Sequence, residues 1–583
     1  MRLSQAFTMT LSLVLGIQSH DLLATPFPNS GSLYRDVRDD SLRRAPRPEA
    51  AQPQVEVQQA PIQAAGEADL QVSHFVVFGN VELSQEELSE LLSPYSHQTL
   101  SPARLHEAME TLRRAYRERG LFTAQVYLPP QAVEDGLVTL HVFEGVLEEG
   151  GVLLSDEGNH VRGRVVESIL QENLATGEVM RVDEFERAIL LADDLPGITT
   201  HSVIYPGASP GEARFLLRTE DTPRVTGNID IDNFGNYYTG EERLGATVYF
   251  NSPTGGGDQL TFRAVTSGSD STYIYSEYSL PVAGNGLRLG VSGDYLTYDL
   301  GEELEDFGAD GEAYSGSLFA AYPFVRSRHT NLNARVEYIH LSLDDDDDSG
   351  MLEAERTLDM VTVSLYGDHD DDFWANGVTY FDASVTGGNV DIDGGDEFQD
   401  FDDRNAGTDG GFLKLNFDVS RLQHLGGNWS ASGRFAGQAA TTNLDTSQKF
   451  FIGGPFSVPG YPVGEMSGDF GVNLQADLRY DIRAIPWGGD LQVSTFASAG
   501  WVRLYEDTWD GWQGENPIIS NNLELYSWGL AATQTWPSGV VLRSSIGRQI
   551  GNNDARNPLN GNDTDQSDDD YRAWFQIIYY FGV

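Results

Sequence analysis

Carboxylates are the residues of this chain whose clustering could do chemistry most directly. Three runs of aspartate occupy residues 344–348, 370–372 and 568–570. Clustered carboxylate oxygens are the ligands that Ca²⁺ prefers, so cation binding is one interpretation of these runs. No run has the spacing of a calcium loop, in which a glycine and a terminal glutamate follow at fixed offsets. We therefore interpret the runs as solvated loops and predict no metal site.

The sequence offers no set of residues arranged for catalysis. None of its 11 histidines lies in an HExxH pattern, and the phosphate-binding pattern GxxxxGK[ST] does not occur. A nucleophile needs a neighbouring base, and a bound nucleotide needs a Gly-rich loop around its phosphates. We predict that the protein is not an enzyme and uses no cofactor.

The most distinctive segment is residues 450–482, which read FFIGGPFSVPGYPVGEMSGDFGVNLQADLRYDI. So many glycines and prolines exclude a helix or a strand ladder over the first half, and they predict a compact turn with several positive φ angles. The second half alternates apolar and polar residues and predicts a strand. The residues that define the turn, called the lid loop below, are Gly453, Gly454, Pro455, Val458, Pro459, Gly460, Tyr461, Gly464, Glu465, Gly468 and Asp469.

Composition narrows the class of protein that must position this loop. The net charge is −51, with 88 acidic and 37 basic residues, which excludes a nucleic-acid partner because no basic face is available. No run of 18 apolar residues predicts a membrane-spanning helix. Residues 1–24 carry Arg2, a short apolar core and a small residue at Ala24, as a secretory signal peptide does.

Two α+β units are expected ahead of the main domain. Residues 25–70 are rich in Pro, Ala and Gln and predict a linker, with no convincing amphipathic helix before it. Residues 71–145 predict the order β-α-α-β-β, with a capping box at Ser84 that starts the first helix. Residues 146–222 predict the same order, so the two units form an internal repeat.

Residues 223–583 have a different texture. Segments of about ten residues alternate apolar with small or polar residues and are separated by turns rich in Gly, Asn and Asp, the pattern of a membrane β-barrel. At roughly 22 residues per strand and loop, the region accommodates about 16 strands. A soluble sandwich or propeller would also alternate. The membrane barrel is favoured by an apolar, aromatic face on the last strand and by long acidic connections at 300–312, 343–356, 391–411 and 505–522.

Several motifs resemble one family in colinear order. The lid loop is similar to the GGP, GY, GE and GD pattern of the two-partner secretion transporters, the haemolysin activation/secretion family. The stretch 229–260 is similar to that family's first barrel hairpin, and the phrases GLFTAQVYLPPQ, VFEG and LADDLPG resemble its paired POTRA domains. The resemblance implies a transmembrane antiparallel β-barrel of about 16 strands preceded by two POTRA domains.

The lid loop departs from the family at one point. Relatives place an Arg where this chain has Pro459, and in them that Arg pairs with an Asp of a barrel strand. Here the matching strand positions are Phe496, Ser498 and Gly500, so both members of the pair are absent together. Removing both members of a buried pair is nearly neutral, whereas removing one costs about 3–5 kcal/mol. We expect the loop to remain inside the barrel, held by proline rigidity and by Tyr461.

The resemblance also implies a function. The protein would lie in the outer membrane, with its POTRA domains in the periplasm, and would export one large β-helical exoprotein of the adhesin or haemolysin type. Its expected partners are this client and outer-membrane lipid, and a monomer is expected. Exposed sheet edges would take up the extended client, at Thr123, Gln125, Tyr127, Thr200, Ser202 and Ile204. An insertase for other barrels and a passive porin stay open as alternatives.

Overall fold

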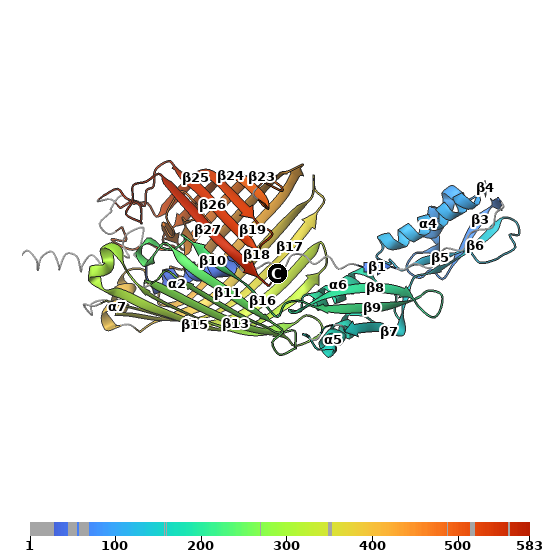
Figure 1. Cartoon of the computed structure of the whole chain (residues 1–583), viewed down its shortest axis with the longest axis horizontal. Coiled ribbons are helices and arrows are strands. Elements are labelled where there is room, and N and C mark those ends of the chain that lie inside the picture. Colours follow the sequence, from blue (N-terminus) through green and yellow to red (C-terminus); the bar gives the residue numbers. More distant parts are fainter. Residues whose placement is uncertain are drawn as a thin grey trace, which may run out of the picture.

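The computed structural model describes residues 28–44, 55–57, 69–156, 158, 160–268, 270–347, 353–393, 395–486, 488–513, 519–557 and 560–582. Its parts are a large closed barrel and two small α+β modules that extend from one end of the barrel (Figure 1). The predicted signal peptide, residues 1–24, lies outside the described residues.

The first module has the predicted β-α-α-β-β order with two added short strands. Its core helix α4 (Pro102–Glu118) starts at the cap Ser101 and buries a stripe that includes Leu105, Leu112 and Tyr116. Its other elements are β2 (Leu70–Val72), β3 (His74–Phe78), α3 (Gln85–Leu92), the 3-10 helix η2 (Ser93–Tyr95), β4 (Gln98–Leu100), β5 (Gln125–Tyr127) and β6 (Leu137–Phe143). Ser84 forms the predicted capping box with Glu87. The sheet order β3-β6-β5 leaves β5 at an edge.

The second module repeats the order without the added strands. Its elements are β7 (Val146–Asp156), α5 (Gly163–Asn173), α6 (Val182–Asp193), β8 (Ile198–Pro206) and β9 (Glu212–Asp221). A short strand of the preceding chain, β1 (Val55–Val57), joins this sheet, and the order is β1-β8-β9-β7.

Sixteen antiparallel strands close the barrel, as predicted. The last strand pairs with the first, Ile577 opposite Ile231, so no sheet edge remains open. Closure pairs every strand on both sides, which lipid requires of any spanning sheet. The strands are β10 (Val225–Asp232), β11 (Arg243–Asn251), β12 (Gln259–Thr266), β13 (Ser271–Pro281), β14 (Arg288–Asp299), β15 (Ala309–Arg326), β16 (Thr330–Asp347), β17 (Glu353–Asp371), β18 (Gly377–Ile392), β19 (Gly410–Gly426), β20 (Trp429–Ala440), β23 (Phe470–Ile482), β24 (Asp490–Arg503), β25 (Asn522–Thr535), β26 (Val540–Ile550) and β27 (Tyr571–Phe581).

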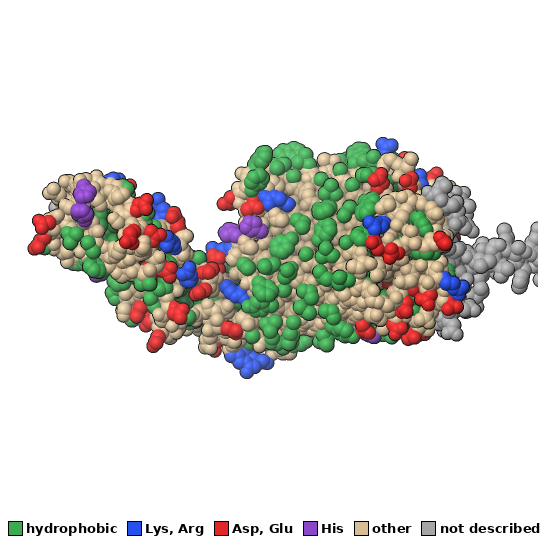
Figure 2. Space-filling view, turned by 180° about the vertical axis from the view of Figure 1, so that it is seen from behind, with side chains coloured by type: hydrophobic (Ala, Val, Ile, Leu, Met, Phe, Trp, Pro, Cys, Tyr) green, Lys and Arg blue, Asp and Glu red, His purple; other side chains and the backbone are tan. Residues whose placement is uncertain are grey.

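The outer wall of the barrel is apolar. Figure 2 shows a band of hydrophobic side chains along the wall, while acidic side chains gather at the end away from the two modules. On β27 the exposed residues include Phe575, Ile577 and Tyr579, while Gln576 on the other face is buried. This alternation is that of a strand with one face in lipid and one facing the lumen. No helix among the described residues is both long and apolar enough to cross a membrane.

A helix lies inside the barrel, and the prediction that no helix precedes the linker was wrong. Helix α2 (Ser30–Arg44) runs within the ring of strands (Figure 1). Leu33 and Tyr34 are buried in a cluster with inward-facing barrel residues such as Leu341. The helix escaped prediction because its surroundings are partly polar, so the sequence SGSLYRDVRDDSLRR does not need a strong apolar stripe.

Two of the aspartate runs are not the solvated loops that we predicted. Residues 344–347 belong to β16, and Asp345 is buried with 4% of its surface exposed. The connection 343–356 is therefore mostly strand and not a long loop. Asp371 ends β17 and pairs with Arg421 at 2.8 Å, at the end of the barrel that faces the modules. Among the described residues, no group of three or more His, Cys, Asp or Glu could hold a metal ion.

The second module is fixed to the barrel by turns at one end. Arg326 of β15 donates to both carboxylate oxygens of Asp194, at 2.8 and 2.7 Å. Asn173 and Arg187 of the module donate to the carbonyl oxygens of Gly284 and Asn285. Charge-assisted pairs with two parallel bonds set orientation as well as distance, so this joint positions the module beneath the lumen.

Candidate functional site: the lid loop and its anchors

The lid loop is a compact hairpin between β20 and β23. Its two short strands, β21 (Phe450–Ile452) and β22 (Met466–Gly468), pair antiparallel, after the 3-10 helix η5 (Thr446–Gln448). Gly453 has a φ of 112°, and a Cβ there would lie 2.3 Å from the carbonyl oxygen of Pro462, so only glycine fits. The predicted turn with positive φ angles is therefore present, at Gly453, Gly454 and Gly464.

The apolar residues of the lid loop pack on the inner wall of the barrel. Ile452, Val458, Tyr461 and Met466 have 0% of their surface exposed. They share a cluster with wall residues of β24 and β25, namely Val502, Leu523 and Leu525. A Cβ on Gly500 would lie 3.0 Å from Val458, so this glycine gives the lid loop room against β24.

The tip of the lid loop is held by neutral contacts at the positions where the resemblance implies a charged pair. Trp574 of β27 donates its indole N–H to the carbonyl oxygen of Pro459 at 2.8 Å. Gly460 lies against Ser527 of β25, which hydrogen-bonds Ser498 at 2.7 Å. The two positions that lack the family's Arg and Asp are thus bridged by neutral groups, and no buried charge is left unpaired.

Side chains of the wall also donate to the lid backbone. Arg434 donates to the carbonyl oxygen of Phe456 at 3.1 Å, and Gln475 donates to that of Ser457 at 2.7 Å. Phe456 meets Phe234 of the first hairpin edge to face, with ring centroids 5.3 Å apart. The sequence does not mark Trp574, Arg434 or Gln475 as anchors. Their inward positions on alternating strands were the only available signal.

Glu465 ties the lid loop to the loop between β26 and β27. It is fully buried and accepts from Thr564 N at 3.0 Å and Thr564 Oγ1 at 2.6 Å, and also from the amide of Asn553. Burial, together with the neighbouring carboxylate of Asp563, raises the pKa of Glu465 to about 8 despite these donors.

Asp469 anchors the end of the lid loop. It is fully buried and accepts from the backbone N–H groups of Leu444 at 3.1 Å and Glu506 at 2.8 Å. The ammonium of Lys449 lies 3.5 Å from the same carboxylate and 4.1 Å from the centre of the Tyr505 ring. A buried carboxylate with this many donors fixes both ends of the hairpin at one point.

A buried arginine joins the lid loop to helix α2. Arg356 of β17 contacts Asp345 of β16 at 2.5 Å and Asp445, just before η5, at 2.7 Å. Ser30, at the start of α2, donates its N–H to Asp345 at 2.7 Å and accepts from Arg356 at 3.1 Å. Thr446 also donates to Asn29 at 3.0 Å. The barrel wall, the segment that leads into the lid loop and the helix are therefore all in contact with one group of residues. Arg356, Asp345, Asp445 and Ser30 form this group, called the Arg356 node below.

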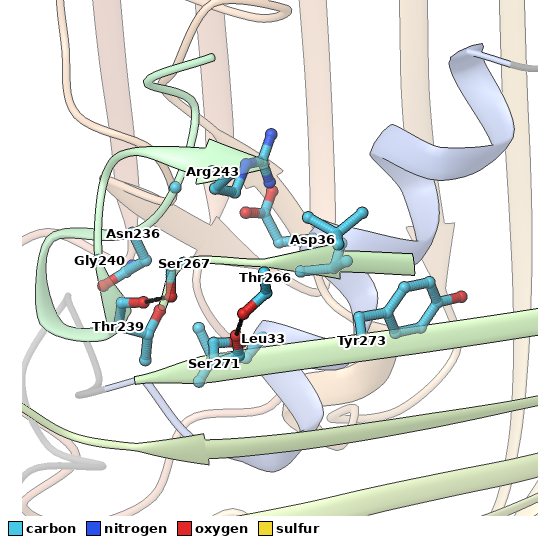
Figure 3. A pocket seen from close by; sticks show the side chains of 13 residues that line it. Leu33, Asp36, Asn236, Thr239, Gly240, Arg243, Thr266, Ser267, Ser271 and Tyr273 are labelled. Carbon is cyan, nitrogen blue, oxygen red and sulfur yellow. Dashed lines mark hydrogen bonds between the residues drawn. The ribbon is translucent and has the colours of Figure 1, made fainter. Parts of the chain in front are cut away.

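A narrow pocket separates α2 from the first hairpins of the barrel. Figure 3 shows Leu33 of the helix facing Thr266 and Ser271 of the wall, with the carboxylate of Asp36 turned toward Arg243. Arg243 also pairs with Asp232 at 3.0 Å, and both side chains are buried. Arg243 and Asp232 belong to the stretch 229–260, which resembles the family's first hairpin, and they line the inner wall beside the helix.

The predicted client-binding residues fall on two different edges. Gln125 and Tyr127 lie on the edge strand β5, while Thr123 precedes it, so the strand is shorter than predicted. Thr200, Ser202 and Ile204 lie on β8, whose outer side is partly covered by β1. Thr200 is bound through its N–H to Asp193 at 2.6 Å.

Sequence comparisons place the chain among known proteins. The model of the ShlB-type POTRA domain matches residues 70–145, and that of the haemolysin secretion/activation protein ShlB/FhaC/HecB matches residues 211–520. The heme/hemopexin transporter protein HuxB of Haemophilus influenzae (strain 86-028NP) is 24% identical over 557 residues, which covers 94% of this chain and 95% of the relative. The outer membrane transporter CdiB of Escherichia coli O6:K15:H31 (strain 536 / UPEC) is 24% identical over 502 residues, 81% of this chain and 77% of the relative.

Solved structures share the fold. CdiB from Escherichia coli superposes with a TM-score of 0.67 at 19% identity and covers 94% of this chain and 96% of that chain. CdiB from Acinetobacter baumannii gives a TM-score of 0.62 at 16% identity and covers 95% and 100%. The match of the family model to more than half of the chain, with the closed barrel and its two modules, shows that the chain belongs to the ShlB/FhaC/HecB family of haemolysin secretion/activation proteins: it is an outer-membrane β-barrel transporter with periplasmic POTRA domains that secretes an exoprotein.

Proposed function

We propose that the lid loop and helix α2 together close the lumen and that the lid loop must leave its seat before an exoprotein can pass. The single observation that carries this proposal is the complete burial of Ile452, Val458, Tyr461 and Met466 against the inner wall. A loop packed as tightly as a protein core occupies the path of any chain that crosses the barrel. The same packing disfavours a passive porin.

The client that we propose is one large secreted protein that arrives unfolded and folds into a β-helix outside the cell. Relatives carry the names heme/hemopexin transporter protein and hemolysin transporter protein, which supports a protein client without specifying which one. The sequence has no nucleotide-binding pattern, so folding of the client on the outer side would supply the free energy for export.

Uptake of the client would begin at the POTRA sheet edges. An extended chain adds to an exposed strand through backbone hydrogen bonds, which demand little of its sequence. Strand β5, with Gln125 and Tyr127, offers such an edge, and strand β8, with Ser202 and Ile204, would offer a second one if β1 left it. We retain Thr123 and Thr200 only as flanking residues of these edges.

The proposed function also assigns a role to each segment of the chain and an oligomeric state. Residues 1–24 would direct export of the chain, residues 71–145 and 146–222 would form the two POTRA domains, and residues 223–583 would form the barrel. Strands β10 and β27 close the barrel within one chain, which supports a monomer surrounded by lipid.

Deletion of residues 450–470 tests the proposal. The shortened protein should conduct ions through planar bilayers far more often than the wild type, and export of its exoprotein should change. Unchanged conductance and unchanged export together would refute the role of the lid loop. Heat-modifiable migration on gels checks that the barrel still folds.

A further inference from the structure

The sheet of the second POTRA domain carries a strand that comes from outside the domain. Strand β1, three residues of the linker, lies parallel to β8, with Val55 opposite Ser202, Glu56 opposite Val203 and Val57 opposite Ile204. On its other side β8 pairs along its whole length with β9. Without β1, β8 would be the edge of this sheet.

The open part of that edge can be located from one hydrogen bond. The N–H of Thr200 donates to Asp193, which belongs to α6 and not to β9. Backbone groups alternate sides along a strand, so those of Ser202 and Ile204 face the same way as that of Thr200. Asp193 therefore occupies the edge at residue 200, and only the part at residues 202–204 accepts another strand.

The register also identifies which residue of β1 faces β8. In a parallel ladder, every second residue of the added strand directs both its N–H and its C=O at the neighbouring strand. Those two groups bond two residues of that neighbouring strand, one on each side of the residue directly opposite. Val55 and Val57 are the partners of Ser202 and Ile204, so Glu56 is the residue of β1 that directs its N–H and C=O at them. The N–H groups of Val55 and Val57 point away from β8.

We propose that β1 is a placeholder: it fills, within the same chain, the site on β8 that takes an extended parallel segment of the unfolded exoprotein, and the client must displace it. The proposal rests on the proposed function, in which POTRA edges receive the client. A strand already seated on the edge shows that its geometry accepts one. Backbone pairing makes few demands on sequence, so a client segment without proline at the residue facing Ser202 and Ile204 can replace β1.

Displacement would also change the tether of helix α2. Residues 45–54 connect α2 to β1, and their full extension spans about 35 Å. Once β1 leaves β8, the next element that the structure describes is β2, and residues 45–69 can span about 80 Å at full extension. The arrival of a client on β8 would thus lengthen the chain that tethers the helix in the lumen.

A peptide added in trans tests the placeholder. The probe is a fluorescent peptide with the sequence of residues 51–61, AQPQVEVQQAP, titrated onto the full chain in nanodiscs. The Glu56→Pro chain, whose β1 lacks the N–H that faces β8, should bind the peptide at least about tenfold more tightly than the wild type, because a tethered competitor acts at millimolar effective concentration. The matched control Val55→Pro should behave like the wild type.

Backbone methylation of the probe sharpens this test. N-methylation at the glutamate of the peptide should abolish binding to the Glu56→Pro chain, while N-methylation at the second valine should not. Equal affinity for wild type and Glu56→Pro, or no binding to either, would overturn the proposal.

A reversible lock separates this proposal from the role of the lid loop. The chain has no cysteine, so Glu56→Cys/Val203→Cys introduces a single pair at opposed positions. Oxidation should lower export of the exoprotein at least tenfold and reduction should restore it, while each single variant exports normally. If the oxidised pair exports at the wild-type rate, β1 is not displaced during export and the proposal fails. The deletion of residues 450–470 tests the role of the lid loop independently of this result.

Discussion

Neutral contacts hold the tip of the lid loop, at positions where the family resemblance implies an Arg–Asp pair. The stability of the closed tip therefore depends on individual hydrogen bonds. The indole N–H of Trp574 reaches the carbonyl of Pro459 in a buried setting. One buried hydrogen bond between neutral groups contributes about 1 kcal/mol, far less than an uncompensated buried charge costs. The tip can therefore be loosened gradually, one donor at a time.

Replacing Trp574 by Phe should weaken the attachment of the lid loop while an aromatic ring still fills the same space. The ring stays, the donor is lost, and the closed state should weaken by about 1 kcal/mol, which multiplies the open fraction roughly fivefold. Single-channel recording in planar bilayers measures that fraction. The control is Trp528→Phe on the lipid face of strand β25, which should leave the open fraction unchanged. Equal behaviour of the two variants would contradict the anchoring role.

Glu465 should make closure depend on pH. Its pKa is about 8 in the closed lid loop and near its ordinary value of roughly 4.3 when released, so the closed state binds a proton that the released state gives up. Closure is thus strongest at low pH and weakens as pH rises from about 5 to 8. The open fraction should increase over this range in the wild type and stay flat in Glu465→Gln. An equal slope in both proteins would exclude Glu465 as the titrating group.

For individual residues of the lid loop, the sequence predicted some features and not others. The spacing of Gly453, Gly454 and Gly464 predicted the turn, because positive φ angles need glycine. Burial of Tyr461 was also expected. Trp574 was not, since it lies 115 residues from its partner and nothing local marks a lumen-facing tryptophan as an anchor.

Helix α2 and the lid loop are separate elements that share the Arg356 node. Asp345 and Asp445 lie on different elements, and both are nearly inaccessible to solvent. Two buried carboxylates stay together only while a cation lies between them. We therefore expect the node to couple release of the helix to release of the lid loop.

Arg356→Met should free both elements. It leaves two buried carboxylates without a cation, at a cost of about 3–5 kcal/mol. We expect a cysteine placed by Leu33→Cys on the helix to react with maleimide much faster in this background, and the pore to conduct more often. The triple variant Arg356→Met/Asp345→Asn/Asp445→Asn removes the charges together and should restore slow labelling. Slow labelling in Arg356→Met itself would show that the helix is held elsewhere.

Strands were more predictable than helices in the lumen. The alternation of Phe575, Ile577 and Tyr579 identifies β27 because one of its faces meets lipid. Helix α2 has no such requirement, since its surroundings combine Leu341 with Arg356 and Asp345. Its local signal was the cap, in which Asn29 and Ser32 exchange hydrogen bonds.

At the scale of the whole molecule, the second module is joined both to the barrel wall and to the chain inside the barrel. The pairing of Arg326 with Asp194 holds the second POTRA domain against the barrel, and β1 connects that domain to the chain that continues into α2. Composition and repeat pattern predicted the two modules and the barrel. The route of the linker was not predictable, because three residues of strand carry no pattern.

The central claim is that export requires the lid loop to leave the wall. In the pair Ile452→Cys/Gly500→Cys, the two Cβ atoms would lie 3.2 Å apart, a few tenths of an ångström short of ordinary disulfide geometry, which a small shift can supply. The matched pair Ser292→Cys/Ser317→Cys joins two neighbouring wall strands and leaves the lid loop free.

Export of the exoprotein by the two pairs, oxidised and then reduced in the same cells, is the most direct measurement. We predict that oxidation stops export through the pair on the lid loop, that reduction restores it, and that the wall pair exports under both conditions. Normal export through the oxidised lid pair would contradict the account.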